Sequence, residues 1–381
     1  MYSCKRCGNS KQSKFSTIKI GTYCTECIEF GRIFIHEELE IKQWMTSSEL
    51  FSDYLLPFEL TKRQHECSEQ LVSYIKEKQN VLIYACCGAG KTEIVFPLIT
   101  YCLKNRLKVA MAIPRRDVVI ELEKRIRQAY PQKLVTSVYG GHRDVIDGDI
   151  ILCTTHQLYR YSNAFDVLIL DEVDAFPYRG NRMLETLAKN SCKGNFVYLS
   201  ATPDIYLKQR VEKKQIQQIT LFKRPHGHPL CIPSVFIGFQ WMLLVRLYFF
   251  LSTYEHKTVL LFVPTITSAN RIYQLIKYIR TCCVFTSQTE KREELMEEIR
   301  KKTFQVVICT TVLERGITIP DVQVAVWNAC HHVFDEATLI QILGRVGRSK
   351  EAYNGNGLLF CFQKSSSVNA CNSSLQRMNA A

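Results

Sequence analysis

The chain has 381 residues, of which 46% are hydrophobic and 22% are charged. At roughly 150 residues per domain, this length predicts two or three domains with cores of their own. The composition excludes a disordered tail protein. The formal net charge of +13 favours a polyanionic partner, either nucleic acid or anionic lipid, although basic enzymes without such a partner are common.

The apolar stretch 241–251 is shorter than the ~20 residues of a membrane span and contains Arg246. We therefore expect a buried helix there and no transmembrane segment. The first residues, Met-Tyr-Ser-Cys-Lys, lack the apolar core of a secretory signal, which predicts a cytoplasmic protein. In that reducing compartment the 17 cysteines are thiols or metal ligands.

Four cysteines lie near the N-terminus as two pairs, each with two residues between its members. They are Cys4, Cys7, Cys24 and Cys27. This is the spacing of a zinc ribbon, in which two tight turns bring four thiolates to one metal ion. We expect a zinc module over residues 1–36, with a small hairpin in its spacer. Four separate buried thiols are the alternative, which the paired spacing disfavours.

Short β-branched or aromatic runs alternate with helical patterns over residues 59–224 and again over 235–363. The expected strands are 81–84, 109–113, 150–154, 167–170, 196–199, 259–263, 306–310, 322–327 and 358–362. This alternation predicts an α/β fold of two similar domains, each a parallel sheet flanked by helices. A connector over 37–58 precedes them, a linker rich in proline and glycine occupies 225–234, and the end, 364–381, is expected to be frayed.

A glycine-containing loop follows the first expected strand and opens a helix, which is the context of a P-loop. The backbone N–H groups of Gly88, Ala89 and Gly90 can wrap an anion there. Lys91 would reach the β- and γ-phosphates of a nucleotide, and Thr92 would hold Mg²⁺. The first position of the motif is alanine where a strict pattern has glycine. A chance match is the alternative, which the strand–turn–helix context disfavours.

Two carboxylates stand at the end of the apolar run 167–170. Ligands bind at the carboxyl ends of strands in open α/β sheets, so Asp171 would hold Mg²⁺ through its water shell. Glu172 is then the candidate general base that takes a proton from the attacking water. The alternative is an acidic helix cap after a buried strand, which the P-loop in the same domain disfavours.

Arginines near the end of the second domain also point to phosphate chemistry. Arg345 and Arg348 belong to the run Gln-Ile-Leu-Gly-Arg-Val-Gly-Arg, which begins at Gln341. The transition state of γ-phosphate transfer spreads negative charge that a guanidinium stabilises. We therefore expect these arginines to act on a nucleotide that the first domain holds.

In their order along the chain, these motifs resemble those of a superfamily-two helicase motor with two RecA-like domains. The resemblance covers residues 59–362 and implies ATP and Mg²⁺ as cofactors. It implies that Gln64, in a Leu-Thr-x2-Gln element, reads adenine and that Gly316 binds the nucleotide. Ser200 and Thr202 would couple the nucleotide site to DNA, and Gln341 would act with the arginines. The residues expected to contact DNA are Pro114, Arg115, Thr154, Thr155, Pro264, Thr265, Thr310 and Thr311.

Each of these short motifs taken alone is also an ordinary turn or cap, so the resemblance depends on their order. Asp-Glu-Val-Asp at 171–174 and a glutamine where RNA-unwinding members have histidine argue against the RNA-remodelling branch. A Cys4 module ahead of the motor, Gly31-Arg32 and Ala175-Phe176-Pro177 make the chain similar to the late-competence DNA-uptake ATPases (ComFA) of Gram-positive bacteria.

That resemblance implies a cytoplasmic motor, peripheral at the inner face of the cell membrane, that couples ATP hydrolysis to the import of single-stranded DNA. The implied partners are competence proteins, including a phosphoribosyltransferase-like one and the membrane DNA channel. Association of the chain into a homo-oligomer is left as an open alternative. A zinc-containing DNA helicase of replication restart or repair is an alternative, although the primosomal helicase carries its cysteines inside the second motor domain. A non-catalytic nucleic-acid-binding scaffold is the other, against which the intact Lys91, Asp171 and Glu172 argue.

Overall fold

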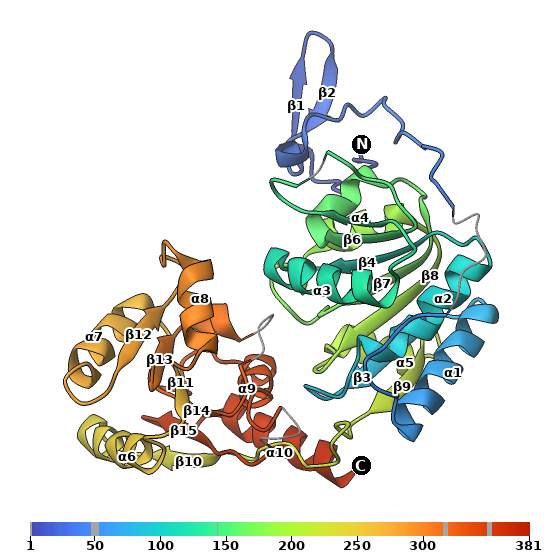
Figure 1. The fold of residues 1–381 in the computed structure, drawn as a ribbon. Coiled ribbons are helices and arrows are strands. Elements are labelled where there is room, and N and C mark those ends of the chain that lie inside the picture. The colour runs from blue at the N-terminus through green and yellow to red at the C-terminus, as the bar shows by residue number, and fades with distance from the viewer. Residues whose placement is uncertain (1, 47–52, 143, 315–318, 349–352) are drawn as a thin grey trace. The chain divides into compact units, whose positions relative to one another are not determined.

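The computed structural model describes residues 2–46, 53–142, 144–314, 319–348 and 353–381. The chain forms two compact units, one of Met1–Ala85 with Gly90–Leu221 and one of Phe222–Ala381 with the loop Cys86–Ala89 (Figure 1). Each unit is built on a parallel sheet flanked by helices, which confirms the predicted α/β class.

The first unit begins with an N-terminal module, residues 2–36. Its elements are η1 (Gln12–Lys14), β1 (Phe15–Ile18), β2 (Gly21–Cys24) and η2 (Ile28–Phe30). Strands β1 and β2 pair as an antiparallel hairpin in which Phe15 lies opposite Cys24. The hairpin therefore spans the distance between the two cysteine pairs, as the spacer length predicts.

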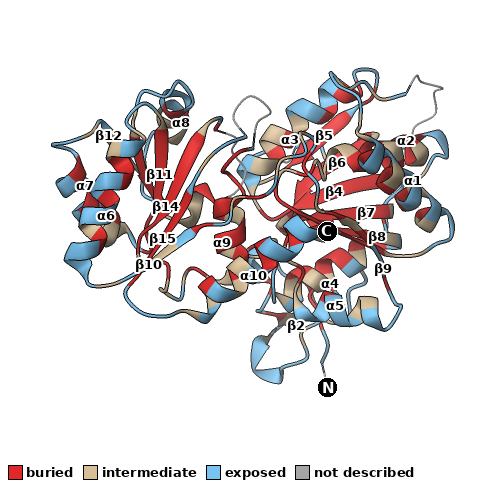
Figure 2. Ribbon diagram, turned by 90° about the horizontal axis from the view of Figure 1, so that it is seen from below, coloured by how far each residue is buried: buried red, intermediate tan, exposed pale blue. Residues whose placement is uncertain are grey.

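The remainder of the first unit alternates strands and helices. Its elements are α1 (Lys62–Lys76), β3 (Val81–Ala85), η3 (Glu93–Val95), α2 (Phe96–Lys104), β4 (Val109–Ile113), α3 (Arg116–Ala129), β5 (Val135–Val138), β6 (Ile150–Thr154), η4 (Thr155–Arg160), β7 (Phe165–Asp171), α4 (Arg182–Ser191), β8 (Cys192–Ser200), α5 (Ile205–Glu212) and β9 (Gln217–Leu221). The strands pair in parallel in the order β5-β6-β4-β7-β8-β3-β9. Every residue of β4 and β6 is buried, as expected of a sheet covered on both faces (Figure 2).

The second unit repeats this pattern. Its elements are β10 (Ser234–Ile237), α6 (Gln240–Thr253), β11 (Thr258–Phe262), α7 (Ile266–Ile276), β12 (Cys282–Phe285), α8 (Arg292–Arg300), β13 (Val306–Cys309), η5 (Thr311–Leu313), β14 (Val322–Val326), α9 (Glu336–Leu343), β15 (Gly357–Cys361) and α10 (Ser366–Ala380). The strands pair in parallel in the order β10-β15-β14-β11-β13-β12. The central strands β11, β13 and β14 are buried along their whole length.

Helix α6 is not the buried helix that its sequence predicts. Leu247 and Leu251 pack into the core of the second unit, but Trp241, Tyr248 and Phe249 are each more than half exposed. Apolar residues lie on every side of the helix, but only one side packs against the sheet. The composition therefore did not show which side is exposed to solvent. Among the described residues, no helix is both long and apolar enough to cross a bilayer.

The expectation of a frayed end at 364–381 is wrong, because α10 forms there. Ser365 caps the helix by accepting a hydrogen bond from the backbone N–H of Val368. The Ser374 hydroxyl donates to Glu336 of α9 over 2.6 Å. One stripe of the helix is buried: Val368, Cys371, Leu375 and Met378. The many serines and asparagines between these positions hid a helical spacing of apolar residues.

If α10 belongs to the core of the second unit, Leu375→Ala will lower the free energy of unfolding by about 2–5 kcal/mol, because it removes a buried side chain and leaves a cavity. The control is Gln376→Ala at the neighbouring exposed position, which should change stability little. Urea unfolding of the full chain measures both. Equal stability of the two variants would contradict the packing of α10.

Candidate active site

Three neighbouring strands bring the nucleotide-binding motifs to one edge of the first sheet. Strand β8 lies between β7 and β3, with Leu199 beside Asp171 and Ser200 beside Tyr84. The P-loop, the paired carboxylates and the Ser-Ala-Thr segment each begin where one of these strands ends. The parallel sheet therefore places all three motifs side by side, where open α/β sheets bind ligands.

The P-loop makes two left-handed turns at Gly88 and Gly90, with φ of 80° and 84°. A side chain is strained in that region, and a Cβ on Gly90 would also collide with the side-chain amide of Gln64. Both glycines are therefore required by the loop's shape, which is the kind of turn in which successive backbone N–H groups bind anions. After Thr92 the chain forms the 3₁₀ turn η3 before α2 begins, where the sequence predicts one continuous helix.

Gln64 is held against the P-loop by the start of α1. The Thr61 hydroxyl accepts a hydrogen bond from Gln64 N at 3.3 Å, and Thr61 N donates to Gln64 Oε1 at 2.9 Å. This reciprocal capping box fixes a side chain that is 2% exposed, beside Gly90. The structure therefore brings Gln64 to the P-loop, while the reading of adenine stays a prediction.

The two carboxylates after β7 lie in different environments. Asp171 is buried, and its Oδ1 accepts a hydrogen bond from Glu172 N at 2.8 Å. Burial raises the pKa of Asp171 to about 6, opposed by the charge of Lys91 and reinforced by that of Glu172. Glu172 itself is half-buried with φ of 52°, a left-handed conformation that is uncommon for a glutamate. Such strain persists where the surroundings hold it and is frequent at functional sites.

Asp174 links the Asp-Glu-Val-Asp motif to the Ser-Ala-Thr motif. Its two carboxylate oxygens accept hydrogen bonds from Ser200 Oγ at 2.8 Å and from Thr202 Oγ1 at 2.9 Å. All three residues lie at the ends of the adjacent strands β7 and β8. Both residues predicted to couple the nucleotide site to DNA thus donate to one buried carboxylate. Sequence reasoning did not single out Asp174, because it lies 26 residues from Ser200 in the chain.

The residues expected to contact DNA belong to two neighbouring segments in each unit. In the first unit Ile113 lies beside Thr154, which places Pro114 and Arg115 next to Thr154 and Thr155. Arg115 is half-buried, while Pro114 and both threonines are buried. The threonine hydroxyls therefore expose little surface to a ligand.

In the second unit Phe262 lies beside Cys309, so the segments at Pro264 and Thr310 begin next to each other. Pro264 is buried, and Thr310 and Thr311 are half-buried. Thr265 is exposed, and its hydroxyl caps α7 by accepting from Ser268 N at 3.1 Å.

The turn after α9 carries the predicted catalytic arginines. Arg345 is 4% exposed and lies near Cys309, whereas Arg348 is exposed to solvent. Gln341 is half-buried on α9. Of the two arginines, Arg348 is therefore the one whose guanidinium is open to a ligand. The predicted nucleotide contact Gly316 lies outside the described residues.

Arg224, directly before the linker, is a residue that sequence reasoning missed. Its guanidinium is 3% exposed and donates to the carbonyls of Gly344, Val346 and Gly347 at 2.7–2.9 Å. These carbonyls belong to the turn that carries Arg345 and Arg348. A buried arginine with several carbonyl partners fixes such a turn firmly, and only the fold could show it because more than 100 residues separate the partners.

The four N-terminal cysteines form a single buried cluster. All four Sγ atoms lie within 4.8 Å of one another, with Cys4 to Cys27 at 3.8 Å and Cys7 to Cys24 at 3.7 Å. A tetrahedral zinc ion with Zn–S bonds of about 2.3 Å requires sulfur atoms about 3.8 Å apart. The geometry and the thiol donors therefore fit Zn²⁺.

Two family models match parts of this chain. Residues 57–205 match the family of the type III restriction enzyme res subunit, and residues 241–350 match the helicase conserved C-terminal domain. Competence protein ComFA of Bacillus subtilis (strain 168) is 34% identical over 99% of this chain and 86% of that protein. The chain belongs to the ComFA family. Competence protein ComFA of Streptococcus pneumoniae (strain ATCC BAA-255 / R6) is 32% identical over 99% of this chain and 90% of that protein.

A solved structure places this ComFA-family chain among helicase folds. Yeast (S. cerevisiae) Dbp5 bound to RNA and ADP BeF3 superposes with a TM-score of 0.61 at 18% identity, covering 84% of this chain and 91% of that one. The family matches and the ComFA relatives confirm the resemblance to a superfamily-two motor, and the solved structure agrees with them in fold. With its helicase domains and its ComFA relatives, the chain is an ATPase of the DNA helicase and translocase type, and helicase domains use ATP with Mg²⁺.

Burial of Asp171 predicts a dependence of stability on pH. Its folded pKa of about 6 lies above its value in the unfolded chain, so protonated Asp171 favours the folded state. This contribution is complete below a pH of about 4 and is lost as the pH rises through about 6. Without nucleotide and Mg²⁺, Asp171→Asn should therefore be more stable than wild type at neutral pH, by up to about 3 kcal/mol.

Urea unfolding between acid and neutral pH measures this difference. Glu212→Gln, at an exposed position on α5, is the matched control and should follow wild type at every pH. The burial of Asp171 would be contradicted by an Asp171→Asn difference that does not change with pH.

Proposed function

We propose that this chain couples ATP hydrolysis to the movement of single-stranded DNA during DNA uptake by competent cells. The observation that carries the proposal is the edge of the first sheet, where the P-loop, Asp171 and Glu172 lie beside the segments at Pro114 and Thr154. A nucleotide site and a phosphate-contacting surface on one edge are what a DNA-driven ATPase needs. The competence proteins to which the chain is similar support the role in uptake.

In this proposal the residues at the nucleotide site divide the chemistry. The P-loop and Lys91 hold the phosphates of ATP, Thr92 and Asp171 hold Mg²⁺, and Gln64 reads adenine. Mg²⁺ neutralises the charge that develops on the phosphates. Glu172 takes a proton from the attacking water, because it is a carboxylate beside the metal site that is less buried than Asp171.

The second unit contributes positive charge during turnover. Arg348 is exposed at the end of a turn that Arg224 fixes, so its guanidinium can stabilise the charge on the transferred phosphate without rearrangement of the turn. Arg345 and Gln341 are assigned with Arg348 to hydrolysis, and Gly316 is assigned to the nucleotide. Because the arginines and the P-loop lysine belong to different domains, hydrolysis requires both domains to act together.

DNA contacts in this proposal are made to phosphates, since a motor that steps along any sequence cannot depend on base edges. The contacts are assigned to the paired segments of each unit. Ser200 and Thr202 connect them to the nucleotide, because both hydroxyls bond Asp174 next to the catalytic carboxylates. A change at the γ-phosphate is thereby passed to Asp174, Ser200 and Thr202, which lie at the same edge of the sheet as Thr154.

We also assign Zn²⁺ to the cluster of four cysteines. The proposed partners are single-stranded DNA and competence proteins, including a phosphoribosyltransferase-like protein and the membrane DNA channel. The proposed location is the cytoplasm at the inner face of the cell membrane.

Two variants separate nucleotide binding from hydrolysis. Lys91→Ala should abolish turnover and weaken ATP binding, because it removes the charge that contacts the phosphates. Glu172→Gln should bind ATP like wild type and lose at least ~10²-fold in turnover, because only the proton acceptor is lost. Equilibrium binding of a fluorescent ATP analogue and steady-state ATPase assays measure the two effects, with Glu212→Gln as control. Turnover at the wild-type rate in Glu172→Gln would rule out Glu172 as the base.

Arg348→Ala tests the contribution of the second unit. We expect it to lose most DNA-stimulated hydrolysis while DNA binding and thermal stability stay close to wild type, because an exposed charge acts on the transition state only. Arg300→Ala, at an exposed arginine of α8, is the matched control. Full stimulation by DNA in Arg348→Ala would show that this arginine does not act in hydrolysis.

A further inference from the structure

We propose that the N-terminal module positions η4, so that metal binding by the four cysteines raises the affinity of the motor for single-stranded DNA. Phe30 is the positioning residue. The inference rests on the proposed function, which assigns Thr154 and Thr155 at the start of η4 to DNA. It gives the predicted zinc module a role in DNA binding.

The ring of Phe30 lies directly on η4. It stacks on Tyr159 with ring centroids 4.7 Å apart and planes inclined by 23°, and its centroid is 6.3 Å from that of His156. Arg160 lies over the Tyr159 ring at 5.0 Å and donates from Nε to Gln157 at 2.7 Å. One side chain of the module therefore contacts the short segment that continues from Thr154 and Thr155.

Arg6 connects Phe30 to the cysteine cluster. Its guanidinium is 7% exposed and donates to Cys27 Sγ at 3.3 Å and to the carbonyls of Cys27 and Phe30 at 2.8 and 3.1 Å. A zinc ion with four thiolates carries net negative charge, which Arg6 balances in a buried position. Because Arg6 joins Cys27 to the backbone carbonyl of Phe30, binding of a metal ion by Cys27 would also fix the backbone at Phe30.

A second contact fixes the module to α4, the helix that packs against η4 in the core of the first unit. Asn190 donates from its side-chain amide to the carbonyls of Lys5 and Arg6 at 2.7 and 3.0 Å. Gly8 adopts φ of 71° against Thr186, where a Cβ would be in tight contact. The first cysteine knuckle therefore docks on α4 through backbone groups, which leaves Phe30 aligned with η4.

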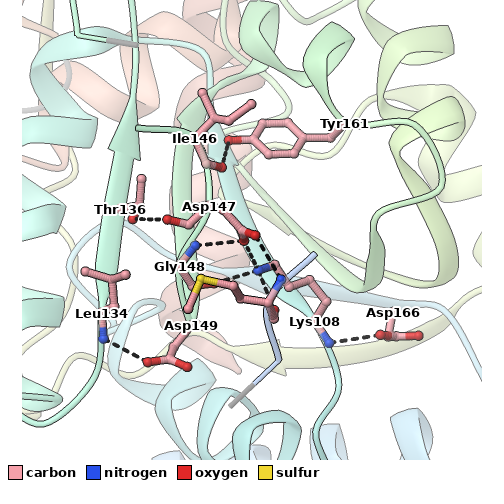
Figure 3. A network of polar contacts seen from close by, with 10 residues as sticks. Lys108, Leu134, Thr136, Ile146, Asp147, Gly148, Asp149, Tyr161 and Asp166 are labelled. Carbon is pink, nitrogen blue, oxygen red and sulfur yellow. Dashed lines mark hydrogen bonds and ion pairs between the residues drawn. The ribbon is translucent and has the colours of Figure 1, made fainter. Parts of the chain in front are cut away.

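The connector holds the other end of η4. Trp44 packs on Tyr161, the residue that follows η4, with ring centroids 5.0 Å apart. The Tyr161 hydroxyl donates to the carbonyl of Ile146 at 2.8 Å (Figure 3). Aromatic side chains from the module and the connector thus cover Tyr159 and Tyr161, two residues apart.

Lys108 fastens the connector next to Trp44. Its ammonium group is buried and donates to the carbonyls of Met45 and Gly148 at 2.7 and 2.6 Å, and it forms an ion pair with Asp147 (Figure 3). Asp147 also accepts a hydrogen bond from Met45 N at 2.8 Å. All three donors of the lysine are used, so the connector is anchored by a fully satisfied buried charge. η4 is therefore supported at both ends, by Phe30 of the module and by Trp44 of the connector.

The test uses the full chain and compares Phe30→Ala with Phe34→Ala. Phe34 is the matched control because its ring contacts lie within the module, on Tyr23 and His36. An aromatic pair contributes about 0.5–1.5 kcal/mol, so Phe30→Ala should raise the concentration of dT oligonucleotide needed for half-maximal ATPase stimulation about two- to tenfold. The basal turnover and the zinc content of purified protein should stay at the wild-type values.

Two further variants complete the test. Phe30→Tyr keeps the ring and should restore the wild-type DNA requirement. Cys4→Ser with Cys7→Ser should lose zinc and weaken DNA stimulation at least as much as Phe30→Ala. Equal DNA requirements for Phe30→Ala and Phe34→Ala would overturn the inference. Failure of wild type to respond to the dT oligonucleotide would instead contradict the proposed function, so the two failures are distinguishable.

Discussion

The nucleotide and DNA-contact motifs of the first unit that follow strands depend on one constraint of parallel sheets, which is that every strand delivers its carboxyl end to the same edge. In the first unit β3, β8 and β7 end at the P-loop, at Ser200 and at Asp171, and β4 and β6 end at the DNA-contact segments. The strand order β6-β4-β7-β8-β3 therefore places nucleotide chemistry and DNA contact on adjacent parts of one edge.

A second constraint on this edge is that each buried carboxylate needs an opposite charge or hydrogen-bond donors beside it. Asp171 has the opposing charge of Lys91, and Asp174 accepts hydrogen bonds from Ser200 and Thr202. Burial makes each of these interactions stronger than it would be in water, and it also makes the loss of one partner costly. A site of this kind is organised before the ligand binds, which is how electrostatic stabilisation of a transition state is most effective.

Motifs that depend on neighbouring residues could be predicted from the sequence. The P-loop, the cysteine knuckles and the carboxylates after β7 are local patterns, and the expected strands at 109–113 and 150–154 agree with β4 and β6 residue for residue. The fold also confirms the α/β class. Contacts between distant segments could not be predicted, because Arg224 meets the turn at Gly344 and Phe30 meets Tyr159 only once the chain has folded.

The wrong expectations about α10 and α6 have the same origin. In α10 the buried positions are separated by serines and asparagines, so composition indicated a frayed end although the helical spacing was present. In α6 apolar residues surround the helix, and nothing in the pattern showed that one side would stay exposed. Composition describes a segment as a whole, whereas burial is decided side chain by side chain by the elements that pack against it.

The most direct test of the account is the ATP turnover of the wild-type chain with and without single-stranded DNA of mixed sequence, at several salt concentrations. We expect turnover to rise with DNA, independently of base sequence, and the DNA concentration needed to rise with salt, because the contacts are to phosphates. Turnover that does not respond to single-stranded DNA, or that responds to one base sequence only, would contradict the account.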